Sequence, residues 1–181
     1  MTGWVLAVED NQDDRELLRH AWLRAAIASR LETVDGGRQA LARLELLHEP
    51  LPSPARPGRG PAERASGQDP GAEGACGLPC AILLDLKMPQ VDGLQVLTQV
   101  RARPWLYNVP VVILSSSAEP SDLVRSYALG ANGFVVKPVD FDDFIVAIAV
   151  TGRYWTAINE PPPQESHART VAGALGRGPA G

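Results

Sequence analysis

Three carboxylates, one hydroxyl and one ammonium each stand at the end of a short apolar run in this chain. Glu9 and Asp10 follow "WVLAV", Asp85 follows "AILL", Ser115 follows "VVIL" and Lys137 follows "GFVV". Three carboxylates packed together repel one another, and a hard divalent cation that prefers oxygen ligands, Mg²⁺ above all, would relieve the repulsion. A metal, an ammonium and a hydroxyl together make a receptor for a phosphoryl group. Asp85 could then act as a metal ligand or as a nucleophile that forms an acyl phosphate.

These residues can meet only if the apolar runs lie side by side and end at the same edge of a sheet. Five such runs alternate with helical patterns, and the runs are continuously apolar rather than alternating. This pattern predicts a parallel sheet covered by helices on both faces. Right-handed crossovers place the carboxyl ends of all strands at one edge, where ligands of such sheets bind. The strands are expected at 4–8, 31–34, 81–85, 109–117 and 133–138, and the last helix at 140–155.

Two segments lack this pattern and are crowded with proline, glycine and alanine. Residues 49–79 separate the second helix from the third strand, and residues 157–181 follow the last helix. Their composition predicts a disordered insertion and a disordered tail. The rest of residues 1–156 is expected to form a single domain.

The overall composition limits the partners and the location that we expect. The formal net charge of −4 over 181 residues gives no electrostatic reason to expect nucleic-acid binding. No apolar run approaches the roughly 18 residues that a membrane span needs, and the N-terminus lacks the basic start and cleavage site of a secretory signal. We therefore expect a cytoplasmic protein that binds neither nucleic acid nor membrane.

The order of the motifs resembles the receiver domain of two-component response regulators. An acidic pair follows the first run, D-x-x-M-P-x-x-D-G begins at Asp85, a hydroxyl follows the fourth run and K-P follows the fifth. The resemblance covers residues 4–155 apart from the insertion. It implies a flavodoxin-like α/β fold, a doubly wound five-stranded parallel sheet of order 2-1-3-4-5 with five helices. It also implies a signalling switch rather than an enzyme, in which a sensor histidine kinase passes a phosphoryl group to Asp85.

The resemblance implies a role for each residue around the acceptor. Asp10 would bind Mg²⁺ directly and Glu9 through water, while Asp85 and the backbone carbonyl of Lys87 would complete the protein ligands. Lys137 would contact the phosphoryl oxygens. The side chain of Lys87 departs from the usual pattern, because a cation two residues after the acceptor could alter the lifetime of the phosphoryl group.

The switch residues are implied in the same way. Ser115 would move toward the phosphoryl group, and the rotamer of Phe134 would follow it, although a strand aromatic can also be a simple core residue. The Lys137–Pro138 peptide bond would be cis, which X-Pro bonds adopt more readily than others. The acidic pair, for its part, could merely cap the first helix.

Two kinds of function remain open at this point. Among single-domain receivers the chain is most similar to the phytochrome-associated group, whose partners are bacterial or cyanobacterial phytochrome kinases. The alternative is a Mg²⁺-dependent phosphatase of the haloacid-dehalogenase type. Such an enzyme needs a second aspartate two residues after the nucleophile as its acid and base, and Lys87 occupies that position.

The last expected helix contains seven apolar residues in succession, "FIVAIAV" from Phe144 to Val150. One stripe, with Phe144, Ile148 and Trp155, would pack on the sheet, so the outer face would be apolar as well. Exposed apolar patches of this kind mark interfaces, unless the insertion or the tail folds over them. We therefore predict a homodimer, with an interface formed by Val124, Tyr127, Ile145, Val146, Ala149, Tyr154 and Trp155.

Overall fold

The computed structural model describes residues 3–48 and 77–162. Five strands alternate with five helices, and two short helical turns complete the described part. The strands are β1 (Trp4–Glu9), β2 (Arg30–Asp35), β3 (Ala81–Asp85), β4 (Val111–Ser115) and β5 (Gly133–Val136). The helices are α1 (Gln12–Arg24), α2 (Gly36–His48), α3 (Gly93–Arg101), α4 (Pro120–Ala128) and α5 (Phe141–Arg153), with a 3-10 turn at Pro104–Leu106 and a π-helical turn at Tyr154–Ile158.

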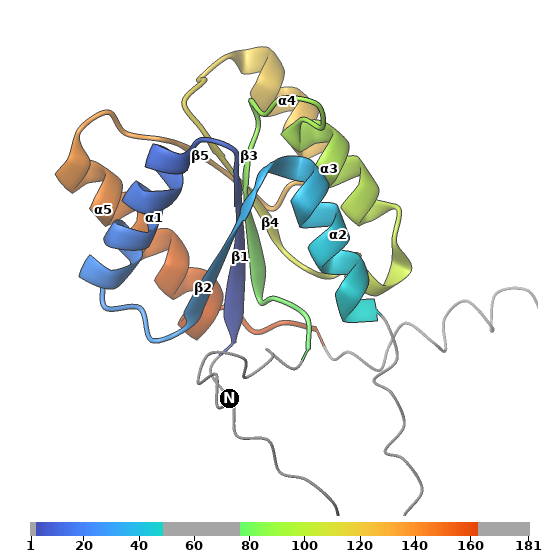
Figure 1. Cartoon of the computed structure of the whole chain (residues 1–181), viewed down its shortest axis with the longest axis horizontal. Helices are drawn as coiled ribbons and strands as arrows, with labels where there is room; N and C mark the ends of the chain where they lie inside the picture. The colour runs from blue at the N-terminus through green and yellow to red at the C-terminus, as the bar shows by residue number, and fades with distance from the viewer. Residues whose placement is uncertain (1–2, 49–76, 163–181) are drawn as a thin grey trace, which may run out of the picture.

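The strands form one parallel sheet in the order β2-β1-β3-β4-β5 (Figure 1). This is the fold class expected from the sequence. All five strands run the same way, so their carboxyl ends meet at one edge of the sheet. We call this the carboxyl edge and the opposite one the amino edge.

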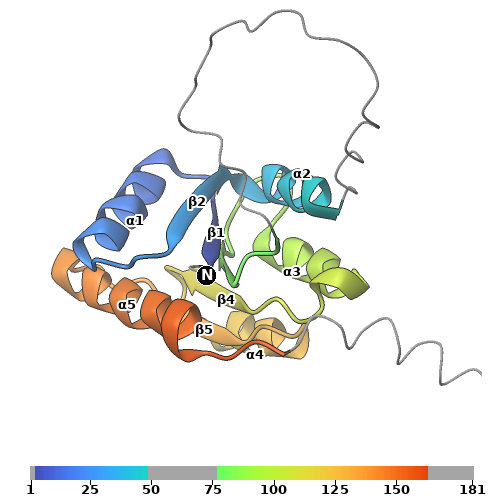
Figure 2. The same ribbon diagram turned by 90° about the horizontal axis from the view of Figure 1, so that it is seen from below.

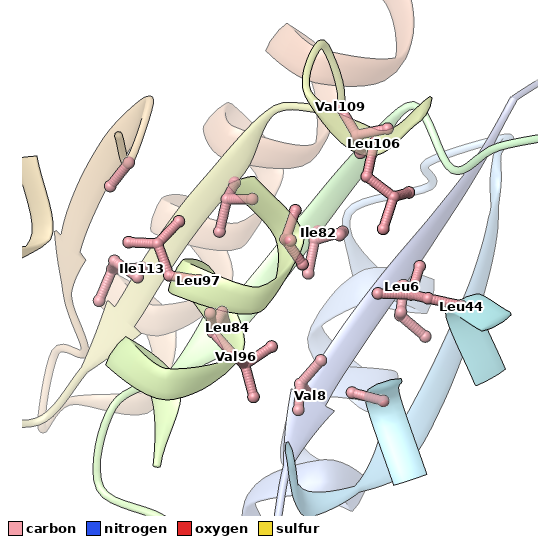
Figure 3. Packing of buried hydrophobic residues seen from close by; sticks show 14 of the residues in the cluster. Leu6, Val8, Leu44, Ile82, Leu84, Val96, Leu97, Leu106, Val109 and Ile113 are labelled. Carbon is pink, nitrogen blue, oxygen red and sulfur yellow. The ribbon is translucent and has the colours of Figure 1, made fainter. Parts of the chain in front are cut away.

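Helices cover both faces of the sheet, with α1 and α5 on one side and α2, α3 and α4 on the other (Figure 2). Under α2 and α3, the large buried residues include Leu44, Leu97 and Ile82. Figure 3 shows Leu44 beside Leu6 of β1, and Leu97 beside Ile113 of β4. Under α1 and α5, Trp22, Phe144 and other apolar residues pack on the opposite face of β1, β3 and β4. Burial of this apolar surface on both faces is the main force that holds the layers together.

The central strands differ from the edge strands. Every residue of β1, β3 and β4 is buried, as continuous apolar runs predict. In contrast, β2 is exposed at both ends and only partly buried between them, and β5 is partly buried and ends exposed. Continuous burial is therefore confined to the three central strands. Each has a neighbour on one side only, and β2 includes Glu32, whose carboxylate pairs with Arg30 and Arg43.

Several element boundaries also differ from the sequence expectations, for local chemical reasons. β4 begins at Val111 rather than 109, because Pro110 has no N–H to donate to a ladder. After α5 the chain continues in a π-helical turn to Ile158, so the domain boundary expected at residue 156 falls inside a helical segment. Most of the predicted insertion, residues 49–76, and the predicted tail from residue 163 lie outside the described residues.

Both ends of the undescribed internal segment lie at the amino edge. The ring of His48, the last residue of α2, lies 4.8 Å from that of Trp105 in the turn before β4. Where the chain re-enters, the carbonyl of Gly77 accepts a hydrogen bond from Trp4 Nε1 at 3.2 Å. The segment therefore begins and ends at the edge opposite the predicted site. Within 3–48 and 77–162, no helix is both long and apolar enough to cross a membrane.

Candidate functional site

Three carboxylates converge at the carboxyl edge. Glu9 is the last residue of β1, Asp10 follows it, and Asp85 is the last residue of the neighbouring strand β3. One oxygen from each lies within 4.8 Å of the others. Glu9 and Asp85 are buried and Asp10 is partly buried. The structure thus brings together the three acidic residues that the sequence analysis singled out.

A lysine pairs with two of these carboxylates and with a third on α1. Lys137 follows β5, and its ammonium nitrogen is 2.5 Å from Glu9 Oε2, 2.9 Å from Asp14 Oδ2 and 3.3 Å from Asp85 Oδ1. Its backbone N–H donates to the carbonyl of Ser115 at 2.8 Å, which ties the end of β5 to the end of β4. The lysine therefore reaches the acceptor candidate from a strand two positions away in the sheet.

Burial and charge shift the pKa values of these groups in a consistent way. Burial raises the pKa of Glu9 and of Asp85, and the nearby Lys137 ammonium only partly offsets this. Burial alone would lower the pKa of Lys137, but hydrogen bonds and charges from the carboxylates outweigh it and raise that pKa. The two carboxyl groups are therefore harder to ionise than exposed ones, in spite of the ammonium beside them.

The donor set fits a hard divalent cation. It offers carboxylate oxygens from Glu9, Asp10 and Asp85, and Mg²⁺ is commonly held by one or two carboxylates together with waters and phosphate oxygens. A cavity of about 220 Å³ lies beside Asp85 and Lys137, and its lining includes Leu17 and Phe144. Its lining is largely apolar, and Glu9, Asp14, Asp85 and Lys137 are its charged members.

The loop after Asp85 is held close to the acceptor. The N–H of Lys87 donates to Asp85 Oδ2 at 2.9 Å. Further on, Asp92 caps α3 in a capping box, and the N–H of Gly93 donates to the carbonyl of Leu86 at 3.1 Å. A Cβ at Gly93 would lie 2.2 Å from the carbonyl oxygen of Asp85. The glycine of the D-x-x-M-P-x-x-D-G motif is therefore required by the close approach of two backbone segments.

The side chain of Lys87 points to α4 and not to the acceptor. Its ammonium lies 2.8 Å from Asp122 Oδ2, in the first turn of α4. Asp122 is buried, whereas the side chain of Lys87 is mostly exposed. The hydrogen bond from Lys87 lowers the pKa of Asp122. An ion pair therefore connects the acceptor loop with α4.

The remaining site residues occupy the positions expected for them, and their roles stay predictions. Ser115 ends β4, is fully buried, and accepts a hydrogen bond from the N–H of Ser117 at 3.1 Å. Phe134 on β5 is partly buried and packs against the apolar cluster under α2 and α3. The predicted cis bond is wrong, because the Lys137–Pro138 peptide is trans. Trans is the favoured form of X-Pro bonds by about 0.5–1 kcal/mol, and with it Lys137 reaches the carboxylates directly.

Two residues of α1 that contact the site were missed by the sequence analysis. Asp14 pairs with Lys137, and Arg15 donates to the backbone carbonyls of Glu9 and Asp10. Helical spacing was the available signal, because Asp14 lies four residues after Asp10 and therefore one turn into the helix that begins at the same edge.

A different kind of surface lies on α4 and α5, the helices on either side of the edge strand β5. In α4 the buried residues are the polar Asp122 and Ser126, while its large apolar side chains face outward. In α5 an exposed stripe recurs every four residues and continues through the π-helical turn. We call this the apolar surface; it consists of Leu123, Val124, Tyr127, Val146, Val150, Tyr154 and Ile158.

The apolar surface overlaps the predicted dimer interface only in part. Val124, Tyr127, Val146 and Tyr154 are exposed, as expected. Ile145 and Ala149 are partly buried, and Ile145 and Trp155 pack against the cluster under α1 and α5. The expectation that Ile145 and Ala149 are exposed was therefore wrong, because the buried face of α5 is wider than one narrow stripe.

Comparison with known proteins identifies the family to which this site belongs. A model of the response regulator receiver domain matches residues 77–149. FilR2, a probable methanogenesis regulatory protein of Methanothrix harundinacea (strain 6Ac), is 32% identical over 158 residues, which are 87% of this chain and 86% of FilR2. The chain therefore belongs to the response regulator receiver family, whose members act as switches in two-component signalling.

Two solved structures narrow the relationship. The phosphorylated cyanobacterial phytochrome response regulator RcpA superposes with a TM-score of 0.69 at 26% identity, covering 90% of this chain and 100% of RcpA. The bacteriophytochrome response regulator RtBRR superposes with a TM-score of 0.60 at 41% identity, covering 91% of this chain and 86% of RtBRR. Phytochrome-associated response regulators are thus among the relatives of this protein.

Proposed function

We propose that this protein is a phosphorylation switch in which Asp85 accepts a phosphoryl group from a sensor histidine kinase with the help of Mg²⁺. The observation that carries the proposal is the group of three carboxylates, Glu9, Asp10 and Asp85, two of which pair with the partly buried ammonium of Lys137. Such a group costs folding free energy because burial opposes ionisation of the acids. It is more useful as a preformed site for a cation and a phosphoryl group than as a packing device.

The proposed transfer is a displacement at phosphorus. A carboxylate oxygen of Asp85 forms a bond to phosphorus while the bond from phosphorus to the histidine nitrogen of the kinase breaks, which leaves an acyl phosphate on Asp85 and a free imidazole. Bound Mg²⁺ would supply positive charge against the phosphoryl oxygens, held by Asp10 and Asp85 directly and by Glu9 through water. Lys137, already 3.3 Å from Asp85 Oδ1, would pair with those oxygens.

The response to phosphorylation would begin at Ser115 and at Lys87. The hydroxyl of Ser115 would leave its hydrogen bond with the Ser117 N–H and donate to a phosphoryl oxygen. Phe134, on the next strand, would then adjust its rotamer. Lys87 already joins the acceptor loop to α4 through Asp122, so a change at Asp85 has a direct route to that helix.

We propose a phytochrome histidine kinase as the partner that supplies the phosphoryl group. The support is the likeness to RcpA and RtBRR, which are named as phytochrome response regulators and match most of this chain. The phosphatase alternative is not favoured. The position that would carry its acid and base holds Lys87, and the ammonium of Lys87 is engaged with Asp122.

We also propose that two copies of the chain associate through the apolar surface. Val146 and Val150 on α5 are 59% and 66% exposed, and Val124 on α4 is 66% exposed. Groups of exposed apolar residues on neighbouring elements often mark an interface. A two-fold pairing would cover the same patch on both copies, and sedimentation of the wild type at micromolar concentration tests it. A single monomeric species would contradict the pairing.

The decisive experiment for the switch is labelling by a small acyl phosphate in the presence of Mg²⁺. We expect one acid-stable, base-labile phosphoryl group per chain in the wild type, no labelling of Asp85→Asn, and none of the wild type in EDTA. Asn is the matched replacement, because it keeps the shape of the side chain but is a poor nucleophile. Asp13→Asn, which changes an exposed carboxylate on α1, is the control and should label normally. Labelling of Asp85→Asn at the wild-type level would rule out Asp85 as the acceptor.

A further inference from the structure

The strongest unexplained interaction near the site is made by Arg15. Its Nη1 donates to the carbonyl of Glu9 at 2.8 Å and to the carbonyl of Asp10 at 2.8 Å. The same nitrogen lies 2.9 Å from Asp35 Oδ1, at the end of β2. The side chain of Arg15 is only 14% exposed, so these contacts replace most of its contact with water.

The backbone that Arg15 holds includes Asp10, which regular structure does not fix. Glu9 ends β1, and Asn11 caps α1 by accepting hydrogen bonds from two N–H groups of the helix. Asp10 lies in a bend between them, so neither the strand ladder nor the helix determines the direction of its carboxylate. Arg15 connects this bend to Asp35, the residue that pairs with Glu9 in the sheet register.

We infer that Arg15 is a positioning residue for the proposed magnesium site, which it serves by fixing the Glu9–Asp10 backbone so that both carboxylates face Asp85. This inference rests on the proposed function. Arg15 does not itself offer a ligand, since a guanidinium is always protonated and only donates hydrogen bonds. It would orient the ligands through hydrogen bonds to their backbone carbonyls, in the way that hydrogen-bond partners of metal ligands generally orient them.

Loss of Arg15 should change the affinity for Mg²⁺ in opposite directions, depending on whether the arginine acts through its charge or by orienting the ligands. A cation beside a cation site repels the metal, so removing only the charge of Arg15 should tighten Mg²⁺ binding. Removing a group that orients the ligands should weaken it, by about ten-fold to a hundred-fold for outer-shell partners. The sign of the change therefore identifies the role, and a purely structural role would change the melting temperature without changing the affinity for Mg²⁺.

The test is calorimetric titration of Mg²⁺ into the full chain carrying Arg15→Gln. The matched control is Arg19→Gln, which removes the same charge one turn further along α1, where the side chain contacts Thr33 of β2. We expect the dissociation constant for Mg²⁺ to rise at least ten-fold in Arg15→Gln and to stay within two-fold of wild type in Arg19→Gln. If Arg15→Gln does not fold, Arg15→Lys is used in its place, because it keeps the charge. We then expect the affinity for Mg²⁺ to fall at least three-fold.

The outcomes separate this inference from the proposal on which it rests. A wild-type protein that does not bind Mg²⁺ would refute the proposed function itself. A wild type that binds Mg²⁺, together with an Arg15 variant whose affinity changes less than three-fold or becomes tighter, would overturn the inference alone. Equal losses in the Arg15 and Arg19 variants would also overturn it, because the effect would then follow helix charge and not the contact with the bend.

Discussion

At the carboxyl edge of the sheet charged side chains are buried, whereas on α4 and α5 apolar side chains are exposed. Glu9, Asp85 and Lys137 have side chains that are 7%, 7% and 14% exposed. On α4 the arrangement is reversed, with Asp122 turned inward and Val124 turned outward. Both arrangements are unfavourable, because charged side chains are normally hydrated and large apolar ones are normally buried.

The two regions differ in what could offset the free energy of burying charge in one and of exposing apolar side chains in the other. The carboxyl edge gathers three carboxylates, and the proposed Mg²⁺ would add positive charge there. The apolar surface is exposed in the part of the chain that the structure describes, and a second copy of the chain would cover it. The first region is the proposed phosphorylation site, and the second is the proposed dimer interface. The Lys87–Asp122 ion pair is one contact between the loop after Asp85 and α4.

The largest effect that we expect concerns the metal ligands. Asp10→Ala should raise the dissociation constant for Mg²⁺ by at least a hundred-fold, since a direct carboxylate ligand is lost and outer partners alone contribute ten-fold or more. Glu9→Ala should raise it less, about ten-fold, if Glu9 acts through water. Calorimetric titration measures both, with Asp13→Ala as the control that removes an exposed carboxylate of α1. Equal affinities in wild type and Asp10→Ala would exclude this metal site.

The next effect concerns the apolar surface. Val146→Asp should raise the dissociation constant of the dimer at least ten-fold, which corresponds to about 1.4 kcal/mol, because a charge would be buried without a partner. Leu23→Asp is the matched control, since Leu23 is an exposed apolar residue of α1 outside the apolar surface. Sedimentation at several concentrations gives both constants. If Leu23→Asp dissociates the dimer and Val146→Asp does not, the interface lies elsewhere.

A smaller effect is expected from pH. The pKa of Glu9 and of Asp85 is raised in the folded protein, so the folded state binds these protons more tightly than the unfolded state does. Their contribution to the free energy of unfolding should therefore fall as the pH rises from about 4 through the raised folded values, and should be constant above them. Denaturation between pH 4 and 7 measures this slope.

Comparison with Asp85→Asn isolates the share of Asp85, because every other titrating group is kept. The variant should lose part of the slope and should be more stable than the wild type near neutral pH without Mg²⁺. Saturating Mg²⁺ should reverse the wild-type slope, since the metal binds ionised carboxylates. A metal-free wild type that gains stability relative to Asp85→Asn as the pH rises would contradict the assignment of these pKa shifts.

The smallest effect is expected at the contact between the two regions. Lys87→Ala should lower the free energy of unfolding by less than about 1 kcal/mol, because the ammonium is largely in water. It should also speed hydrogen exchange in the first turn of α4. The double variant Lys87→Ala/Asp122→Asn closes the cycle, and in the Asp122→Asn background the lysine change should have no further effect on exchange. Additive effects would mean that the two side chains do not act on each other.

The parts of the fold that depend on local pattern could be predicted from the sequence. Continuous apolar runs placed β1, β3 and β4, and the parallel arrangement then placed Glu9, Asp10 and Asp85 at one edge. The features that were not predicted depend on the rotation of a helix about its axis and on contacts between residues that are distant in the sequence. The outward direction of Val150 and the partial burial of Ile145 follow from the rotation of α5 on the sheet. The pairing of Lys87 with Asp122 depends on where α4 sits, which no local pattern reports.

The positions of His48 and Gly77, which flank residues 49–76, have a consequence for how this protein can change over evolution. His48 and Gly77 both lie at the amino edge, while Asp85 and its partners lie at the opposite one. Residues can be gained or lost between them without moving a ligand, so drift in length should be tolerated there. A single exchange at Gly93, by contrast, would push a Cβ into the backbone of Asp85. We therefore expect selection to tolerate sequence change between His48 and Gly77 at the amino edge. We expect it to restrict change at Gly93 at the carboxyl edge.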